Sequence, residues 1–257
     1  KSLALLADCG IKISNGDRKL KATAENFPVE VLFLRDDDIP QYVEQGVADL
    51  GILGENEVWE KGKEVTQLEK LGFASCKLVL AIPKDEVYSG LSWFRDKKIA
   101  TSYPSILRNF FKGHEIEVQI EEIGGSVEIA TGIGLADAIF DIVSTGSTLM
   151  LNGLKEAEVV SRSEAILIAN PNLNAEKIKT VDRLLFRIKA VRNASANKYI
   201  LLNAPDTAIA GICQILPGMK SPTILPLATP GWSSLHSVIR EDEFWDIIDQ
   251  LKDHGAE

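Results

Sequence analysis

A strand-like run followed by a turn of small residues is the segment of this chain best suited to bind a phosphate. Residues 138–143 form the run, and residues 149–154 can begin a helix after the turn. Such a turn lets successive backbone N–H groups point at one phosphate, and the helix N-terminus adds a favourable field. Glycine in the turn allows the backbone to approach closely. The predicted phosphate loop consists of Ser144, Thr145, Gly146, Ser147 and Thr148.

Two aspartates, Asp137 and Asp141, lie four positions apart just before the loop. A carboxylate is out of place beside a phosphate, but it suits neutral hydroxyl groups such as those of a ribose. The loop alone fits an ordinary strand-to-helix connection equally well, because short motifs often match by chance. The strand context and the upstream acids favour a ribose-phosphate site.

Residues 128–149 resemble the signature of the ATP phosphoribosyltransferase family, whose members catalyse the first step of histidine biosynthesis. Every constrained position of that signature is met, by Glu128, Gly134, Ala136, Ile139, Asp141, Ile142, Thr145, Gly146, Thr148 and Leu149. Residues 35–56 and 99–104 resemble two further blocks of the family, and residues 216–227 resemble the C-terminal block of its long form. The resemblance runs in order along almost the whole chain.

The resemblance implies an enzyme that joins N1 of the ATP adenine to C1 of phosphoribosyl pyrophosphate and releases pyrophosphate. It also implies Mg²⁺, inhibition by L-histidine, a homodimer or homohexamer, and a cytoplasmic location. The adenine nitrogen has a lone pair, so no strong general base is needed and positioning and electrostatics can carry the reaction.

The resemblance also implies roles for individual residues. The loop would bind the 5-phosphate, and Asp141, with Asp137 as second choice, would hold the ribose hydroxyls and favour positive charge at C1. Arg35 and Lys77 are candidates to help the pyrophosphate leave. The expected nucleotide-binding residues are Arg35, Asp49, Gly54, Glu55, Lys77, Thr101, Ser102 and Tyr103. The expected histidine-binding residues are Asn203, Met219 and Thr223.

Two of these residues have simple structural explanations. Read alone, Asp49 fits a turn between a helix and a strand, and Arg35 beside residues 36–38 fits a solvated charge cluster. Glu55 follows a glycine at a strand end and fits a surface position as well as a ligand contact.

The composition is that of a globular protein, with 45% apolar residues, 25% charged residues and a formal charge of −9. The negative charge argues against a nucleic-acid partner. No apolar run approaches the roughly 18 residues of a membrane span. The three cysteines are scattered and fit a reducing compartment, and the three histidines lack metal-ligand spacing, so we predict no metal-ligand set from the sequence.

Strands alternate with helices over the first two thirds, which indicates an α/β fold. A helix, an Ala-Asp pair, an apolar strand and a glycine turn occur around residues 43–54 and again around residues 130–146. We therefore predict two similar lobes resembling type II periplasmic binding proteins, with a ligand cleft at the strand ends. Lobe I is expected at residues 1–76 plus 157–190, and lobe II at residues 77–156. We also expect Glu128 to lie on a helix.

Residues 175–196 have apolar positions at helical spacing and predict a long connecting helix. Residues 197–257 then show a βαββα order, which is typical of a ferredoxin-like βαββαβ domain without its last strand. The long-form resemblance implies that this domain is regulatory. The family opens with a strand and a Gly-Arg-Leu turn that this chain lacks, so we expect a fragment, and the sequence leaves open whether a signal peptide precedes it.

Two other functions remain to be compared with the transferase. A type II solute-binding protein would share the two lobes, but it would need neither the phosphate loop nor the C-terminal domain. A type I phosphoribosyltransferase has a similar loop, but it usually carries two adjacent acids there, whereas Ile142 follows Asp141.

Overall fold

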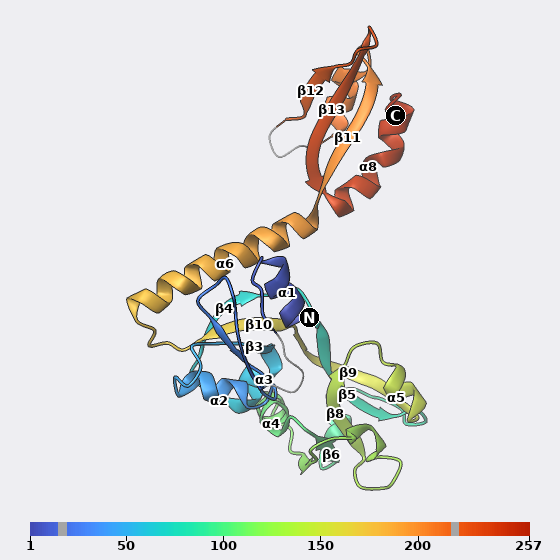
Figure 1. Ribbon diagram of the computed structural model, residues 1–257. Coiled ribbons are helices and arrows are strands. Elements are labelled where there is room, and N and C mark those ends of the chain that lie inside the picture. Colours follow the sequence, from blue (N-terminus) through green and yellow to red (C-terminus); the bar gives the residue numbers. More distant parts are fainter. Residues whose placement is uncertain (15–19, 217–220) are drawn as a thin grey trace. The chain divides into compact units, whose positions relative to one another are not determined.

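The computed structural model describes residues 1–14, 20–216 and 221–257 (Figure 1). The chain divides into two compact units. The first contains residues 1–7 and 11–181, and the second contains residues 8–10 and 182–257. The predicted connecting helix is present as α6 (Ala175–Ala196), and the division between the units falls within it.

One sheet of the first unit has three antiparallel strands in the order β3-β10-β4, and a two-stranded ladder, β1-β2, lies earlier in the chain. Val43, Leu53, Ile166 and Ile168 form the buried cluster of this part. The elements here are α1 (Ser2–Asp8), β1 (Lys21–Thr23), β2 (Glu30–Leu32), α2 (Ile39–Glu44), β3 (Leu50–Gly54), α3 (Glu55–Lys61), β4 (Thr66–Lys70) and β10 (Ala165–Ala169).

The other sheet of the first unit has five strands in the order β7-β6-β8-β5-β9. Strands β6, β7 and β8 run parallel to one another, whereas β5 is antiparallel to both β8 and β9. Residues 78–82 of β5 are all buried, because apolar clusters cover both faces of the sheet. The elements are β5 (Cys76–Pro83), η1 (Leu91–Phe94), β6 (Lys98–Thr101), α4 (Pro104–Gly113), β7 (Gln119–Glu122), η2 (Val127–Ile129), β8 (Ala138–Val143), α5 (Ser147–Leu151) and β9 (Leu154–Ser163).

The chain passes between these two sheets twice, through residues 71–75 and through Glu164. The boundary expected between residues 156 and 157 falls inside β9, which pairs with β5 along its length. The strands therefore assign residues 76–163 to the five-stranded sheet.

The second unit has a sheet in the order β11-β13-β12 (Figure 1). Residues of α7 and α8 contribute to one buried cluster with this sheet. The backbone of Glu257 exchanges two hydrogen bonds of 2.9 Å with Asn203 at the edge of β11. This strand order and the βαββα sequence agree with the predicted ferredoxin-like domain. The elements are β11 (Asn197–Pro205), α7 (Ile209–Ile215), β12 (Thr223–Pro226), β13 (Trp232–Arg240) and α8 (Glu241–Asp253).

Some local predictions were wrong or incomplete. Glu128 lies in the short 3-10 helix η2 rather than on a longer helix, because glycines flank this segment on both sides. Helix α5 begins at Ser147, and Leu154 already belongs to β9. Strand β9 was not predicted from the sequence, because it is an edge strand with charged residues, and such charges protect an edge from further pairing.

Candidate active site

Three strands of the five-stranded sheet bring their polar ends to one edge. Strands β6 and β8 run parallel, with Thr101 opposite Phe140, so both end at this edge. Strand β5 starts there, because Lys77 is paired with Val143 at the end of β8. The turn after β6 and the predicted phosphate loop after β8 therefore lie on the same side of the sheet.

The phosphate loop has a backbone conformation that leaves its amide groups open. Gly146 has φ +78°, a left-handed conformation that glycine adopts without strain. Among the described residues, no acceptor receives a hydrogen bond from the backbone N–H of Ser144, Thr145 or Gly146. The Thr145 and Ser147 hydroxyl oxygens lie 3.0 Å apart. The loop thus presents free donors in succession, as phosphate binding requires.

Lys77 and Glu156 lie beside this loop. The Lys77 ammonium donates to a Glu156 carboxylate oxygen at 2.5 Å. A Cβ placed on Gly146 would approach the other Glu156 oxygen to 3.3 Å, so the backbone passes close to that carboxylate. The loop therefore lies beside an ion pair, in which the Glu156 carboxylate offsets the positive charge of Lys77.

Asp141 lies on β8, partly buried, two residues before the end of the strand. Burial raises the pKa of Asp141, and the negative charge of Glu128 raises it further, while the N–H of Ile142, which donates to Asp141 at 2.7 Å, opposes both. An ionised Asp141 would therefore gain from a hydroxyl donor or a positive charge placed against it.

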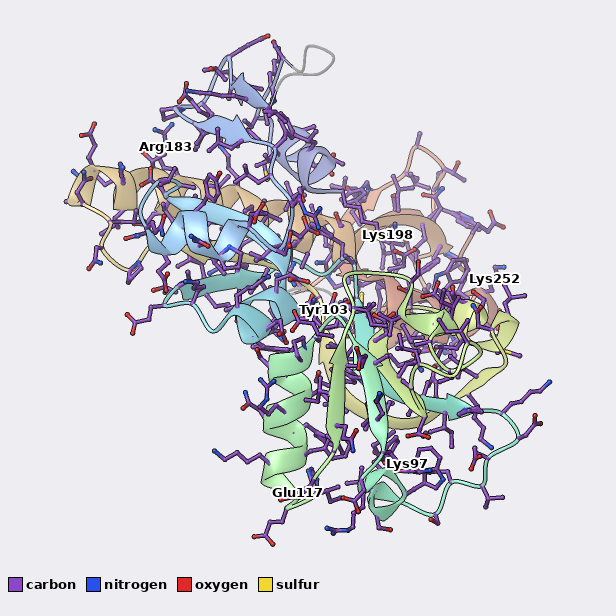
Figure 2. All side chains as sticks on the ribbon, turned by 90° about the horizontal axis from the view of Figure 1, so that it is seen from below. Lys97, Tyr103, Glu117, Arg183, Lys198 and Lys252 are labelled. Atoms are coloured by element: carbon purple, nitrogen blue, oxygen red, sulfur yellow. The ribbon has the colours of Figure 1, made fainter. Side chains whose placement is uncertain are left out.

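The turn from β6 into α4 carries Tyr103, which Figure 2 shows at one end of α4, with Glu117 toward the other end. The Tyr103 hydroxyl donates to Glu57 at 3.3 Å. Burial raises the pKa of Tyr103, and the charges of Glu57 and Asp141 raise it further. The Thr101 hydroxyl is buried and accepts the Tyr103 N–H at 2.8 Å, and Ser102 donates to Ile123 O at 2.7 Å. Thr101 and Ser102 thus shape the turn that presents Tyr103.

Asp137 lies at the opposite edge of the sheet, immediately before β8. One of its carboxylate oxygens accepts the backbone N–H of Lys98 at 2.9 Å, at the start of β6. Ser144 comes seven positions after Asp137, which corresponds to roughly 23 Å along a strand. The structure therefore does not bring Asp137 to the loop, and its carboxylate anchors the adjacent strand instead.

The expected nucleotide-binding residues of the first sheet are also divided between the two ends of a strand, here β3. Gly54 and Glu55 lie at the end of β3, where Glu55 is buried and pairs with Lys70 at 3.2 Å. Asp49 precedes β3 and pairs with Lys177 at 2.8 Å, at the other end of the strand. Arg35 is exposed and bonds Asp37 at 3.1 Å.

In the second unit, Asn203 lies on β11 and Thr223 on β12, with β13 between these strands. Met219 lies outside the described residues. Within the described ranges, no cluster of three or more histidine, cysteine or acidic side chains has metal-binding geometry. Every helix in those ranges is too short or too polar to cross a lipid bilayer.

Four residues that are not among the site residues predicted from the sequence lie around Tyr103 and Asp141 in the structure. The buried Asn56 and Ser163 bond each other, with the Ser163 hydroxyl donating to Asn56 Oδ1 at 2.8 Å. The Asn56 amide also donates to Glu57 at 2.8 Å. The negative charge of Glu128 raises the pKa of Asp141, after the larger effect of burial. Helix α3, which positions Asn56 and Glu57, had a usable signal in its early glutamates and in Gly62, a left-handed C-cap.

Comparison with known proteins agrees with this geometry. Residues 35–190 match the family model described as ATP phosphoribosyltransferase, and residues 194–257 match the model described as HisG, C-terminal domain. An ATP phosphoribosyltransferase of Bacteroides thetaiotaomicron is 58% identical over all 257 residues, which cover 91% of that protein. One from Parabacteroides distasonis is also 58% identical, again with 100% of this chain and 91% of that protein covered.

Two solved structures have related folds. A chain of the ATP phosphoribosyl transferase (HisG:HisZ) complex from Thermotoga maritima has a TM-score of 0.65 and 26% identity, with 74% of this chain and 91% of that chain covered. A substrate-binding protein of an amino acid ABC transporter has a TM-score of 0.51 at 14% identity, with 76% and 80% covered, and shows the shared fold alone. The predicted likeness to periplasmic binding proteins is thus confirmed, and the chain belongs to the ATP phosphoribosyltransferase family in its long form, with the regulatory C-terminal domain.

Proposed function

We propose that this chain transfers the phosphoribosyl group of phosphoribosyl pyrophosphate to N1 of ATP, and that the phosphoribosyl half binds at the end of β8. The open N–H groups of Ser144, Thr145 and Gly146 carry this assignment. Three successive donors beside hydroxyl side chains match the acceptors of a 5-phosphate. Lys77 is bonded to Glu156 next to Gly146, and it adds positive charge on the same side when a phosphate takes the place of Glu156.

Asp141 is assigned to the ribose. Its carboxylate can accept hydrogen bonds from ribose hydroxyls, which relieves the cost of keeping it ionised in a partly buried position. Negative charge at this position also stabilises the positive charge that develops at C1 as the bond to pyrophosphate breaks. The nucleophile is the lone pair of adenine N1, so the residues act by positioning and by charge.

Mg²⁺ fits this site as an ion that the substrate brings. Mg²⁺ commonly uses one or two carboxylates together with substrate phosphates. Asp141 and Glu128 are two acidic groups whose charges already interact, and they would hold the ion. When bound, Mg²⁺ neutralises charge that builds up on the departing pyrophosphate.

The nucleotide half is assigned to the turn after β6 and to the strand end that faces it. Tyr103 offers an aromatic ring, and Gly54 and Glu55 lie at the end of β3. Arg35 is exposed and able to reach an anionic group. Asp49 and Asp137 are left out of the assignment because their carboxylates are engaged at the far ends of their strands.

The second unit is assigned to feedback control by L-histidine, with Asn203 and Thr223 on the sheet as candidate contacts. Its sheet exposes apolar side chains, including Tyr199, Leu201 and Leu225, which suits association of chains into a dimer or hexamer. We place the reaction in the cytoplasm, where ATP and phosphoribosyl pyrophosphate are available.

The test measures phosphoribosyl-ATP by ultraviolet absorbance in Mg²⁺, ATP and phosphoribosyl pyrophosphate during a titration with L-histidine. Turnover that histidine suppresses supports both the transfer and the regulatory assignment. Turnover without suppression retains the transfer and rejects histidine control. Folded protein that binds a small solute but gives no turnover would overturn the proposal in favour of a binding protein.

A further inference from the structure

Two carboxylates of helix α3, Glu57 and Glu60, reach from the helix beside the first sheet to the turn that carries Tyr103. We call them the α3 carboxylate pair. Helix α3 follows β3 of the three-stranded sheet, whereas the turn and α4 follow β6 of the five-stranded sheet. The pair thus links an element next to one sheet with an element next to the other, beside the proposed active site.

Glu60 satisfies backbone donors at the start of α4. One of its oxygens accepts the Ser105 N–H at 2.9 Å, and the other lies 3.1 Å from Ser105 N and 3.0 Å from Ile106 N. The first N–H groups of a helix have no partner within the helix, and Tyr103 at the N-cap supplies no side-chain bond. A carboxylate at a helix N-terminus is favoured both by these bonds and by the helix dipole.

Glu57 holds the side chain of Tyr103. One oxygen of Glu57 accepts both the Asn56 amide at 2.8 Å and the Tyr103 hydroxyl at 3.3 Å. Asn56 is itself fixed, because its N–H donates to the Ser163 hydroxyl at 3.1 Å and Ser163 is the last residue of β9. A continuous set of bonds therefore runs from the second crossover between the sheets to the phenol of Tyr103.

We propose that Glu57 and Glu60 are positioning residues for phosphoribosyl transfer, which fix the turn from Tyr103 to Ile106 so that the phenol stays beside Asp141. The inference rests on the proposed function, in which Asp141 holds the ribose and Tyr103 the nucleotide. Neither glutamate needs to touch a substrate. An error of about 1 Å in the alignment of two reactants can cost on the order of 10²-fold in rate, so the turn must be held firmly.

The decisive experiment compares Glu60→Ala with Glu44→Ala in the full chain. Glu44 is a matched control, because it also accepts a backbone N–H, that of Glu64 at 3.0 Å, and pairs with Lys63, entirely beside the first sheet. We expect Glu60→Ala to lower kcat on the order of 10²-fold with KM values within about threefold, since alignment rather than uniform binding is lost. Glu44→Ala should leave kcat within about threefold at a similar melting temperature.

Hydrogen exchange of the Ser105 and Ile106 amides provides a reading that does not depend on activity. Both amides should lose protection in Glu60→Ala and keep it in Glu44→Ala. Equal loss of kcat in the two variants, or unchanged kcat with both amides unprotected, would overturn the positioning role. If Glu60→Ala does not fold, Glu60→Gln replaces it, because a neutral amide oxygen can still accept an N–H. In Glu60→Gln, a kcat equal to that of the wild type with both amides unprotected would also overturn the positioning role.

Glu57 is tested by a cycle with Tyr103. Glu57→Ala and Tyr103→Phe each remove the same bond, so the double variant should lose no more kcat than Tyr103→Phe alone. Glu57→Gln, which keeps an acceptor, should restore most of kcat. Additive losses, or no restoration by Gln, would reject the role of Glu57. Wild-type protein without turnover would reject the proposed function itself, which these variants cannot do.

Discussion

The two edges of the five-stranded sheet at which its strands begin and end carry similar residues with different partners. Asp137 and Asp141 lie on the same segment, four positions apart, and both resembled ribose ligands in the sequence. Asp137 is 47% exposed and bonds the start of β6 through Lys98, whereas Asp141 is partly buried near the open loop and Glu128. A carboxylate with a structural partner is already satisfied, and one that burial leaves costly to ionise has reason to bind a substrate.

Replacing each aspartate with asparagine should give the largest difference in activity between the two edges. Asp141→Asn should lower kcat/KM by on the order of 10²–10³-fold at an unchanged melting temperature, because a charge that stabilises the transition state is lost. Asp137→Asn should keep activity within about threefold and lower the melting temperature by a few degrees, as expected for a weakened hydrogen bond of about 1 kcal/mol. Steady-state kinetics and thermal unfolding check both. Equal losses of activity would remove the distinction.

Two glycines in the same backbone conformation offer the next comparison. Gly146 has φ +78° and Gly153, at the opposite edge, has φ +70°. Valine at either position costs about 1–2 kcal/mol from the left-handed conformation. Gly146→Val should in addition abolish measurable turnover, because its side chain would meet Glu156 and obstruct the loop. If Gly153→Val, measured at matched stability, inactivates the enzyme as strongly, the loop has no special role.

Two lysines provide a smaller contrast. Lys77 lies beside the loop, whereas Lys155 donates to the backbone oxygens of Lys84 and Glu86 at the opposite edge. Lys77→Met should raise KM for phosphoribosyl pyrophosphate by about tenfold, or roughly 1.4 kcal/mol of binding, with little effect on KM for ATP. Lys155→Met should change neither. A rise in KM for ATP alone would move Lys77 to the nucleotide half.

The smallest expected effect is the pH dependence of stability that Glu57 of α3 causes. Burial raises the pKa of Glu57. A raised carboxyl pKa stabilises the folded state at low pH, and that contribution is lost as pH rises through the folded pKa. Glu57→Gln should therefore gain stability relative to wild type at pH 7 and lose that advantage toward pH 4. Unfolding by urea at both pH values measures the difference, and a gain that grows toward low pH would contradict the burial of Glu57.

Much of the fold and part of the site could be predicted from sequence. Apolar runs located β5, β8 and β10, helical spacing gave α6 its full range, and the loop with Asp141 followed from residue types. Strand β9 was missed because it is a charged edge strand, and helix α3 was missed although its early glutamates and Gly62 offered a signal. Contacts between distant residues, such as Lys77 with Glu156 and Glu60 with Ser105, could not be predicted because they depend on how the strands and helices pack.

The sequence by itself determined the family, the alternation of strands and helices, and the loop that can bind a phosphate, because these depend on local composition and spacing. Only the tertiary structure decided which end of a strand each acid occupies. Strand direction and register separate Asp141 from Asp137, and they bring Lys77 to the loop. Side chains on one segment look equivalent in sequence, but a strand extends about 3.3 Å per residue, so four positions are enough to move a carboxylate out of the site.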